Sequence, residues 1–375
     1  MKILMMLSKP FMTDLRVYNE AKALIDAGHN VTVIVWDRRK EYKKEEEVNN
    51  IRIKRIHNTT FMKHLPNDIF RNPIWWRKAF KKAIKLYEGE FKFDAVHCHD
   101  LDTLKIGVKV KKKTGCKLIY DAHEIFGYMI EDDVPRFIVS YVFSMEKRLI
   151  KYVDHIITVN EPLLKYFKTI SKKPITIVMN CKDITSKKYI PSNNDNFTII
   201  YIGTLSKRRL FPDLVHGLGK ISDIKFIIAG KKEKIGYYQL VEQASKNYKN
   251  VDFLGEIPFN EVIPRTFKSD IIVSVANPNS TKSKIETPNK LLEAMACGKP
   301  IICNKGTNAA ELTERFNCGL VVEYNLKSIS EAVIKLRDNP LLCEKLGKNG
   351  LKAAINEFNW DKQKEKLLAV YNGLQ

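Results

Sequence analysis

The residues best suited to bind a phosphate lie between positions 286 and 300, in the run ETPNKLLEAMACGKP. Pro288 favours the start of a helix, and Gly298 favours its end. A helix N-terminus offers free N–H groups at the positive end of the dipole, and Lys290 would add a full charge there. Glu293 lies one turn later, where a carboxylate could accept the paired hydroxyls of a ribose. The alternative is an ordinary capped helix with Glu293 on its solvent-facing side.

Two histidine-containing segments each follow an apolar run. His97, His99 and Asp100 occur in the order HxHD, and His123 occurs in DAHE. The HxHD order suggests a metal, but two histidines at i and i+2 supply too few ligands. We therefore interpret the first group as polar residues of a cleft between domains. Viewed by itself, His123 would more often be structural than catalytic.

The loop after the first apolar run, SKPFMTDLR, contains Asp14 and Arg16 but no glycine. A dinucleotide-binding loop requires the glycines of GxGxxG at this point, and no P-loop motif occurs in the chain either. These absences argue against NAD, FAD and P-loop enzymes. Asp14 and Arg16 could contact an acceptor substrate, or they could be a helix N-cap followed by a surface charge.

The elements that must position these residues alternate regularly. Short β-branched runs are separated by helix-length amphipathic segments, which predicts an α/β protein with parallel sheets covered by helices. The pattern restarts after a polar stretch at 180–196, and the chain beyond 339 is expected to be helical up to 371. The expected strands are 3–7, 31–36, 51–56, 94–98, 117–121, 155–159 and 175–179, then 197–203, 224–230, 251–255, 270–275, 299–304 and 319–323.

Composition bounds the class of protein. The 375 residues are 44% hydrophobic and 29% charged, as in a soluble globular protein, and no apolar run approaches the roughly 18 residues of a bilayer span. Seven cysteines occur singly without a CxxC pair, so we expect buried thiols in the reducing cytoplasm. The net charge of +21 attracts anions, but no nucleic-acid-binding signature accompanies it, so we do not expect nucleic acid as a partner.

The segment from Ile74 to Tyr87 is strongly amphipathic at helical spacing. Trp75 and Trp76 lie on the apolar side, and the other side carries Arg77, Lys78, Lys81, Lys82 and Lys85. Such a helix could attach the protein peripherally to the anionic cytoplasmic face of a membrane. The competing interpretation is that its apolar side packs on the first sheet and its lysines are solvated.

The run TPNKLLEAMACGKPII resembles the signature of retaining glycosyltransferases of family 4, which share the GT-B architecture. Further likeness occurs in the same order in DLRVYNEAKALIDAGHNVTVIVWDR, KLIYDAHEIF, FTIIYIGTLSKRRLFPDLV, VDFLGEIPFNEV and EFNWDKQKEKLLAVY, so it covers nearly the whole chain. The resemblance implies two Rossmann-like domains facing across a cleft, with a C-terminal helix returning toward the N-terminal domain. The expected parts are an acceptor domain at 1–182, a linker at 183–196, a donor domain at 197–357 and a crossover helix at 358–375.

The resemblance also implies roles for individual residues. Glu293 matches the glutamate that binds the ribose, whereas its usual partner eight positions earlier is Ile285, so the role of the adjacent Glu286 is open. Thr204 replaces a phosphate-binding arginine, a contact that Arg208 or Lys290 would then supply. The implied catalytic residues are His123, Arg209, Lys290 and Glu286. The implied donor-binding residues are Gly203, Thr204, Arg208, Gly255, Ile257, Pro288, Asn289, Leu291 and Glu293, and the acceptor-side residues are Asp14, Arg16, His99 and Asp100.

The implied reaction moves a sugar, with retention, from a nucleoside diphosphate to a glycan, glycolipid or lipid-linked acceptor, with UDP preferred to GDP. Cationic side chains would replace a metal ion, and no cofactor is expected. Two other classes of protein are alternatives. A nucleotide-sugar epimerase of the same architecture would convert the donor without an acceptor, and a nucleic-acid-binding protein would use the charge of +21.

Overall fold

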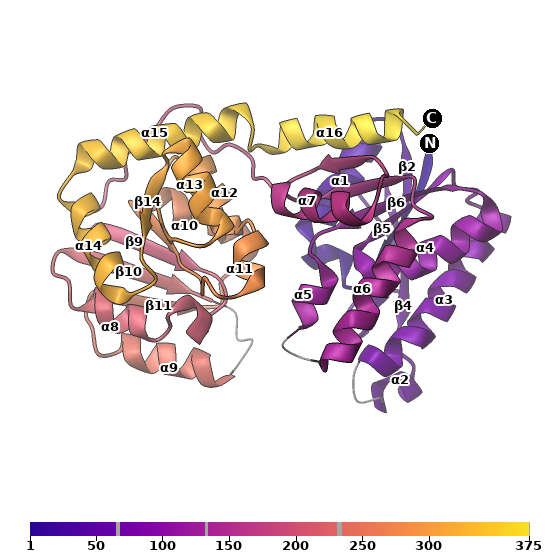
Figure 1. The fold of residues 1–375 in the computed structure, drawn as a ribbon, viewed down its shortest axis with the longest axis horizontal. Helices are drawn as coiled ribbons and strands as arrows, with labels where there is room; N and C mark the ends of the chain where they lie inside the picture. The colour runs from indigo at the N-terminus through magenta and orange to yellow at the C-terminus, as the bar shows by residue number, and fades with distance from the viewer. Residues whose placement is uncertain (65–67, 132–133, 231–234, 375) are drawn as a thin grey trace. The chain divides into compact units, whose positions relative to one another are not determined.

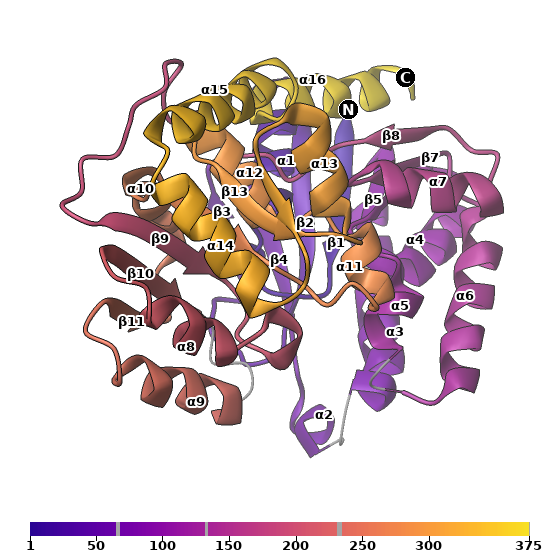
Figure 2. The same cartoon turned by 60° about the vertical axis from the view of Figure 1, so that its left-hand side comes forward.

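The computed structural model describes residues 1–64, 68–131, 134–230 and 235–374. The chain forms two compact α/β units (Figures 1 and 2). Unit 1 comprises Met1–Met179 together with Lys364–Gln375, and unit 2 comprises Asn180–Gln363. The last segment of the chain therefore belongs to the N-terminal unit, as the expected return of the C-terminal helix requires.

Unit 1 is built on an eight-stranded sheet in the order β3-β4-β2-β1-β5-β6-β7-β8. All of its pairings are parallel except that of β3 with β4. The seven strands expected from the sequence are present, but β3 was missed because its residues, EEEV, do not alternate between apolar and polar. The strands are β1 Lys2–Leu7, β2 Asn30–Asp37, β3 Glu45–Val48, β4 Ile51–His57, β5 Ala95–His99, β6 Lys117–Ala122, β7 His155–Thr158 and β8 Ile175–Ile177.

Helices cover this sheet and bury their apolar sides on it. In α3, Trp75 is fully buried and stacks on Trp36 of β2, with ring centroids 5.3 Å apart. The helices of unit 1 are α1 Leu15–Asp26, α2 Thr60–His64, α3 Asp68–Glu88, α4 Asp100–Thr114, α5 Phe126–Ile130, α6 Arg136–Ile150 and α7 Glu161–Ile170, joined by the end of α16 Trp360–Asn372. Tyr371 of α16 is fully buried, so the C-terminal residues are part of the core of unit 1.

Unit 2 contains a six-stranded parallel sheet in the order β11-β10-β9-β12-β13-β14, with all six strands as expected. The strands are β9 Phe197–Ile202, β10 Ile224–Ala229, β11 Val251–Gly255, β12 Ile271–Ser274, β13 Ile301–Asn304 and β14 Gly319–Val322. The helices are α8 Asp213–Gly219, α9 Ile235–Ser245, α10 Phe259–Lys268, α11 Thr281–Ile285, α12 Asn289–Cys297, α13 Asn308–Phe316, α14 Leu326–Arg337 and α15 Pro340–Asn356, with a 3-10 turn at Lys207–Arg209.

In both sheets, successive strands are added first on one side of the first strand and then on the other side, so the strand order reverses there. In unit 1 the chain proceeds outward from β1 through β2 to β4 and then resumes on the other side with β5. Unit 2 repeats this with β9, β10 and β11 on one side and β12 on the other, which is the Rossmann strand order. Ligands of such sheets bind beyond the carboxyl ends of the two strands that flank the reversal. Functional residues are therefore expected in the loops after β1, β5, β9 and β12.

All seven cysteines are free and buried, which confirms the expectation of buried thiols.

Candidate active site

In unit 2, helix α12 begins beside the strand reversal. Pro288 is extended (φ −69°, ψ 137°) and precedes the first helical residue, Asn289, and no side chain caps this end. Gly298 ends the helix in the left-handed conformation with φ 65°. The predicted start and stop are thus confirmed. Leu291 is fully buried on the side that packs into the core, so it holds the helix in place.

Glu293 lies inside the unit and does not face solvent. Its exposed fraction is 6%, which excludes the surface-helix interpretation of this segment. Burial raises the pKa of Glu293, while the positive charges of Lys182 and Lys290 act in the opposite direction. Among the described residues, Glu293 has two cations nearby but forms no direct ion pair. Its carboxylate is therefore suited to accept hydrogen bonds from the hydroxyl groups of a ligand.

The Lys290 side chain lies against the end of β9. Its Nζ is 4.7 Å from the ring centroid of Tyr201, and a Cβ added to Gly203 would come within 2.6 Å of that nitrogen. Gly203 therefore leaves the space that the ammonium fills. Burial and the neighbouring Arg209 lower the pKa of Lys290 to about 8. Glu293 and Glu286 act in the opposite direction, and an anionic ligand would further favour the charged form of Lys290.

Arg209 and Glu286 face one another across a small pocket. Arg209 Nη2 is 3.8 Å from Glu286 Oε2, and both residues line this pocket together with Ser274, Ser283, Pro288 and Thr307. The Oγ atom of Ser274 is buried without a hydrogen-bond partner among the described residues. The pocket thus combines a cation, a carboxylate and one unsatisfied hydroxyl group, all of which can bind polar groups of a ligand.

The remaining predicted donor residues lie on the neighbouring strand ends. Thr204 and Arg208 are exposed beyond β9, and the carbonyl of Arg208 accepts hydrogen bonds from the Asn277 amide at 2.9 Å and the Tyr324 hydroxyl at 3.0 Å. Gly255 ends β11 with φ +69°, where the Tyr238 hydroxyl would contact an added Cβ at 2.6 Å. Ile257 is half-buried in the following loop.

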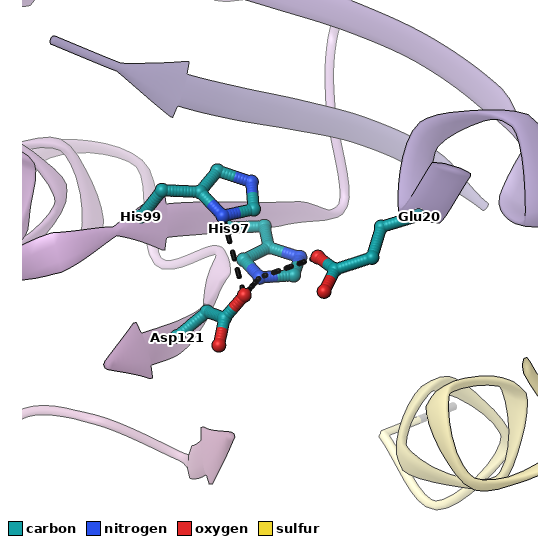
Figure 3. A group of neighbouring side chains, drawn as sticks. All are labelled: Glu20, His97, His99 and Asp121. Carbon is teal, nitrogen blue, oxygen red and sulfur yellow. Dashed lines mark ion pairs between the residues drawn. The ribbon is translucent and has the colours of Figure 1, made fainter. Parts of the chain in front are cut away.

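In unit 1, four fully buried side chains meet beside the strand reversal. Glu20 extends from α1 toward His97 and His99 of β5, and Asp121 reaches them from β6 (Figure 3). Each offers one ligand atom, and these atoms lie within 4.8 Å of one another. The fold thus places two carboxylates from other elements beside the two histidines of the HxHD motif.

Arg16 already occupies the carboxylates of this cluster. Its Nη2 is 2.9 Å from Asp121 Oδ1, its Nε is 3.2 Å from Oδ2, and its Nη1 donates to the Val178 carbonyl at 2.6 Å. The same Nη2 forms an ion pair with Glu20 Oε1 at 3.0 Å, but the angle at which the two groups meet does not allow a hydrogen bond. A guanidinium thus supplies the positive charge that a metal ion would otherwise bring. With an exposed fraction of 5%, Arg16 is not a surface charge, so that interpretation was wrong.

Asp14 caps α1 and is held by a neighbouring cation. Its carboxylate accepts a hydrogen bond from the Val17 amide at 3.2 Å and forms an ion pair with Lys9 at 2.8 Å. Burial would raise the pKa of Asp14, but Lys9 and His123 outweigh it and lower the pKa to about 2. The N-cap interpretation of Asp14 is therefore confirmed.

His123 and Asp100 form the solvent-facing edge of the cluster. His123 Nε2 is 3.0 Å from Asp121 Oδ2, and its Nδ1 is 3.6 Å from Asp100 Oδ2. Their side chains are 13% and 25% exposed, whereas His99 is fully buried. Of the predicted acceptor-side residues, Asp100 thus has the greatest access to a ligand, and Arg16 and His99 could act only through their neighbours.

Two Rossmann-type sheets, each with a polar cluster at its strand reversal, define the GT-B class of glycosyltransferases. The chain belongs to glycosyltransferase family 4: a model described as Glycosyltransferase Family 4 matches residues 15–185, and one described as Glycosyl transferases group 1 matches residues 183–353. The protein is therefore a glycosyltransferase.

Individual relatives agree with this assignment. The glycosyltransferase MJ1069 of Methanocaldococcus jannaschii is 23% identical over 88% of this chain and 87% of its own. A GDP-mannose-dependent monoacylated alpha-(1-6)-phosphatidylinositol monomannoside mannosyltransferase of Corynebacterium glutamicum is 30% identical over 40% of this chain and 39% of its own. Among solved structures, HepE of Anabaena in complex with UDP has a TM-score of 0.76 with 14% identity, covering 100% of both chains.

Proposed function

We propose that the protein transfers a sugar, with retention of anomeric configuration, from a nucleoside diphosphate to a glycan, glycolipid or lipid-linked acceptor. The observation that carries this proposal is the start of α12, where Lys290 and the buried Glu293 occur one turn apart beside Arg209. In this proposal the Glu293 carboxylate binds the ribose and the amides of Asn289 and Lys290 face the diphosphate. The strand ends at Gly203 and Gly255 provide backbone approach to the rest of the donor.

Charge neutralisation is the main chemical contribution that we assign to the donor site. Negative charge grows on the diphosphate as the sugar departs, so fixed cations stabilise the transition state more than the ground state. We assign this task to Arg209 and Lys290. The carboxylate of Glu286, 3.8 Å from the Arg209 guanidinium, would direct Arg209 toward the pocket. We propose that they make a metal ion and a cofactor unnecessary, so that turnover survives EDTA. Complete loss of activity that added metal restores would contradict this.

We propose UDP as the preferred leaving nucleotide. The solved HepE complex contains UDP, whereas the Corynebacterium relative is named as GDP-mannose-dependent, so both bases occur among similar proteins. Thermal unfolding with UDP, GDP, ADP and their sugars tests the choice. A ligand at about 100 times its Kd should add about 2.7 kcal/mol to the free energy of unfolding. No stabilisation by any nucleotide would contradict the donor site itself.

Retention and the presence of an acceptor need separate tests. The proton NMR spectrum of the product should show the same anomeric configuration as the donor, and an inverted product would exclude retention. No finding supports the epimerase alternative. Incubation of the donor alone should leave the sugar unchanged, because transfer requires an acceptor.

We also propose reversible attachment of unit 1 to an anionic membrane surface, where a lipid-linked acceptor would be found. Among the described helices, none combines the length and apolar character needed to cross a bilayer. The apolar side of α3 packs on the sheet through Trp75, while Arg77, Lys81 and Lys85 are exposed. Lys82 instead forms an ion pair with Glu45 at 3.1 Å. The exposed cations, rather than the tryptophans, would therefore make the contact.

A further inference from the structure

Large aromatic side chains are exposed at the start of two helices of unit 1. In α6, Phe137 and Tyr141 are 73% and 54% exposed, and in α3, Phe70 is 55% exposed. Phe61, in the short helix α2 that precedes α3, is 66% exposed. Burial of such side chains away from water is favourable, so a group of them on the surface indicates a site that binds an apolar partner.

The fold brings these side chains to one end of unit 1. Helices α2 and α3 follow β4, and α6 follows β6, and both strands belong to the parallel part of the sheet. Because the carboxyl ends of parallel strands meet at one edge of a sheet, the helices that follow them begin beside that edge. Both views show α2 and the first turns of α3 and α6 at the same end of unit 1 (Figures 1 and 2). We call Phe61, Phe70, Phe137 and Tyr141 the aromatic rim.

The two long helices repeat the same order of exposed residues. In α3, Phe70 is followed by the exposed Arg77 and Lys81 at positions i+7 and i+11. In α6, Phe137 is followed by the exposed Arg148, again at i+11. Residues at these spacings lie on one face of a helix. At 1.5 Å per residue, the cations lie about 10 and 16 Å behind the aromatic residue along the helix axis.

The helix between them adds further positive charge. Lys109, Lys112 and Lys113 are exposed on α4, which contacts both α3 and α6. Burial and the like charges of Lys109 and Arg148 lower the pKa of Lys105, also on α4. The outer face of these three helices therefore attracts an anionic surface.

We propose that the aromatic rim enters the hydrocarbon layer of an anionic bilayer, while the cations behind it bind the lipid phosphates. This inference rests on the proposed attachment of unit 1 to a membrane, and it identifies the part of the surface that enters. A bilayer places anionic headgroups at a fixed depth above hydrocarbon, which matches the order of residues that α3 and α6 share. Arginine and lysine side chains are long enough to extend toward the headgroups. A protein partner would not require two helices to repeat this order.

Insertion of the rim would bring the acceptor-side residues of unit 1 to the membrane surface. Asp100 and His123 follow the carboxyl ends of β5 and β6, at the same edge of the sheet as the rim. An acceptor carried by a lipid could reach these residues while its chain stays in the bilayer. The inference therefore favours a lipid-linked acceptor over a free glycan.

The decisive variant is Phe70→Ser with Phe137→Ser, which removes two exposed rings and no charge. Circular dichroism checks that it folds, as expected for exposed positions. Leu240→Ser with Leu341→Ser, at positions of unit 2 that are 48% and 79% exposed, is the matched control. Affinity is measured by co-sedimentation with vesicles of phosphatidylcholine and phosphatidylglycerol.

We expect the Phe70→Ser, Phe137→Ser protein to bind these vesicles at least about tenfold more weakly than the wild type, because both rings lose their burial in hydrocarbon. The control should bind as the wild type does. Insertion itself is measured with Phe137→Trp, whose fluorescence should be quenched by lipids brominated on the acyl chain. Leu341→Trp should show no quenching beyond that of the wild-type tryptophans.

Equal vesicle affinity of the wild type and the Phe70→Ser, Phe137→Ser protein would overturn the inference and leave the cations as the whole contact. Absence of acyl-chain quenching in Phe137→Trp would contradict it as well. A dimer in sedimentation velocity that the double variant dissociates would assign the rim to a second copy of the chain instead. If the wild type does not bind the vesicles, the proposed membrane attachment fails together with this inference. Sugar transfer is judged separately, by nucleotide binding to unit 2.

Discussion

Tyr371, in the last helix of the chain, is hydrogen-bonded to His97 at the end of β5, with 2.7 Å between its hydroxyl oxygen and Nδ1. The contact is fully buried and joins the C-terminal segment to the cluster that contains Asp121. Because Nδ1 is occupied, the other nitrogen of His97 is directed toward Asp121 and Glu20, at 3.7 Å and 3.9 Å.

Tyr371→Phe should therefore destabilise the protein while keeping the aromatic ring in the core. The change leaves a buried nitrogen of His97 without a partner, which costs about 1–3 kcal/mol of unfolding free energy. Urea unfolding followed by circular dichroism measures the difference. Tyr141→Phe, at a position that is 54% exposed, should be nearly neutral, and an equal effect of both changes would refute the role of the buried hydroxyl.

Arg209→Ala should reduce kcat more than it weakens donor binding. Its guanidinium neutralises charge that develops only as the diphosphate departs, so the loss falls on the transition state. Lys207→Ala, an exposed change on the same 3-10 turn, is the control. Equal losses in kcat and donor affinity for Arg209→Ala would instead indicate ordinary ground-state binding.

Nucleotide affinity should depend on the protonation of Lys290. The pKa of this ammonium is lowered to about 8, so the free protein loses the charge as the pH rises above that value. We expect the Kd for UDP to increase by up to about tenfold per pH unit there, because the bound diphosphate favours the protonated form. Calorimetric titration at several pH values checks this. Lys290→Arg, which stays charged, should show a flat profile, and the same slope in both proteins would assign the effect to another group.

Reversal of two exposed charges on α3 should weaken membrane binding. Each lysine near an anionic surface contributes about 1 kcal/mol, and salt screens this attraction. The double variant Lys81→Glu and Lys85→Glu should therefore sediment less with vesicles containing anionic lipid at low salt. Lys327→Glu with Lys335→Glu, both exposed on α14, is the matched control. Equal binding by all three proteins would leave α3 as a packing element only.

The sequence predicted the strands well because apolar periodicity carries that information locally. It missed β3, whose three glutamates take their place only through pairing with β4 and ion pairs such as that of Glu46 with Arg55. It also placed the limits of α12 correctly, since Pro288 and Gly298 mark them within the motif.

The buried cluster of unit 1 was harder to predict because its members are distant in the chain. Glu20, Asp121 and Tyr371 come from three elements, and Glu20 is a carboxylate in a helix whose other buried residues are mostly apolar. The one local signal was Asp121 in DAHE, two residues before His123 on the same strand end. Arg16 gave no sign of burial because its partner lies 105 residues away.

The most direct test of the account is the affinity of UDP for Glu293→Gln compared with Glu286→Gln. If the buried Glu293 carboxylate binds the ribose, its neutral amide should lose charge-assisted hydrogen bonds worth about 1.5–3 kcal/mol, and UDP affinity should fall about 10- to 150-fold. Glu286→Gln should keep UDP affinity, because the role proposed for Glu286 is to direct Arg209, whose charge acts on turnover more than on donor binding. Unchanged UDP binding by a folded Glu293→Gln protein would contradict the donor site proposed at α12.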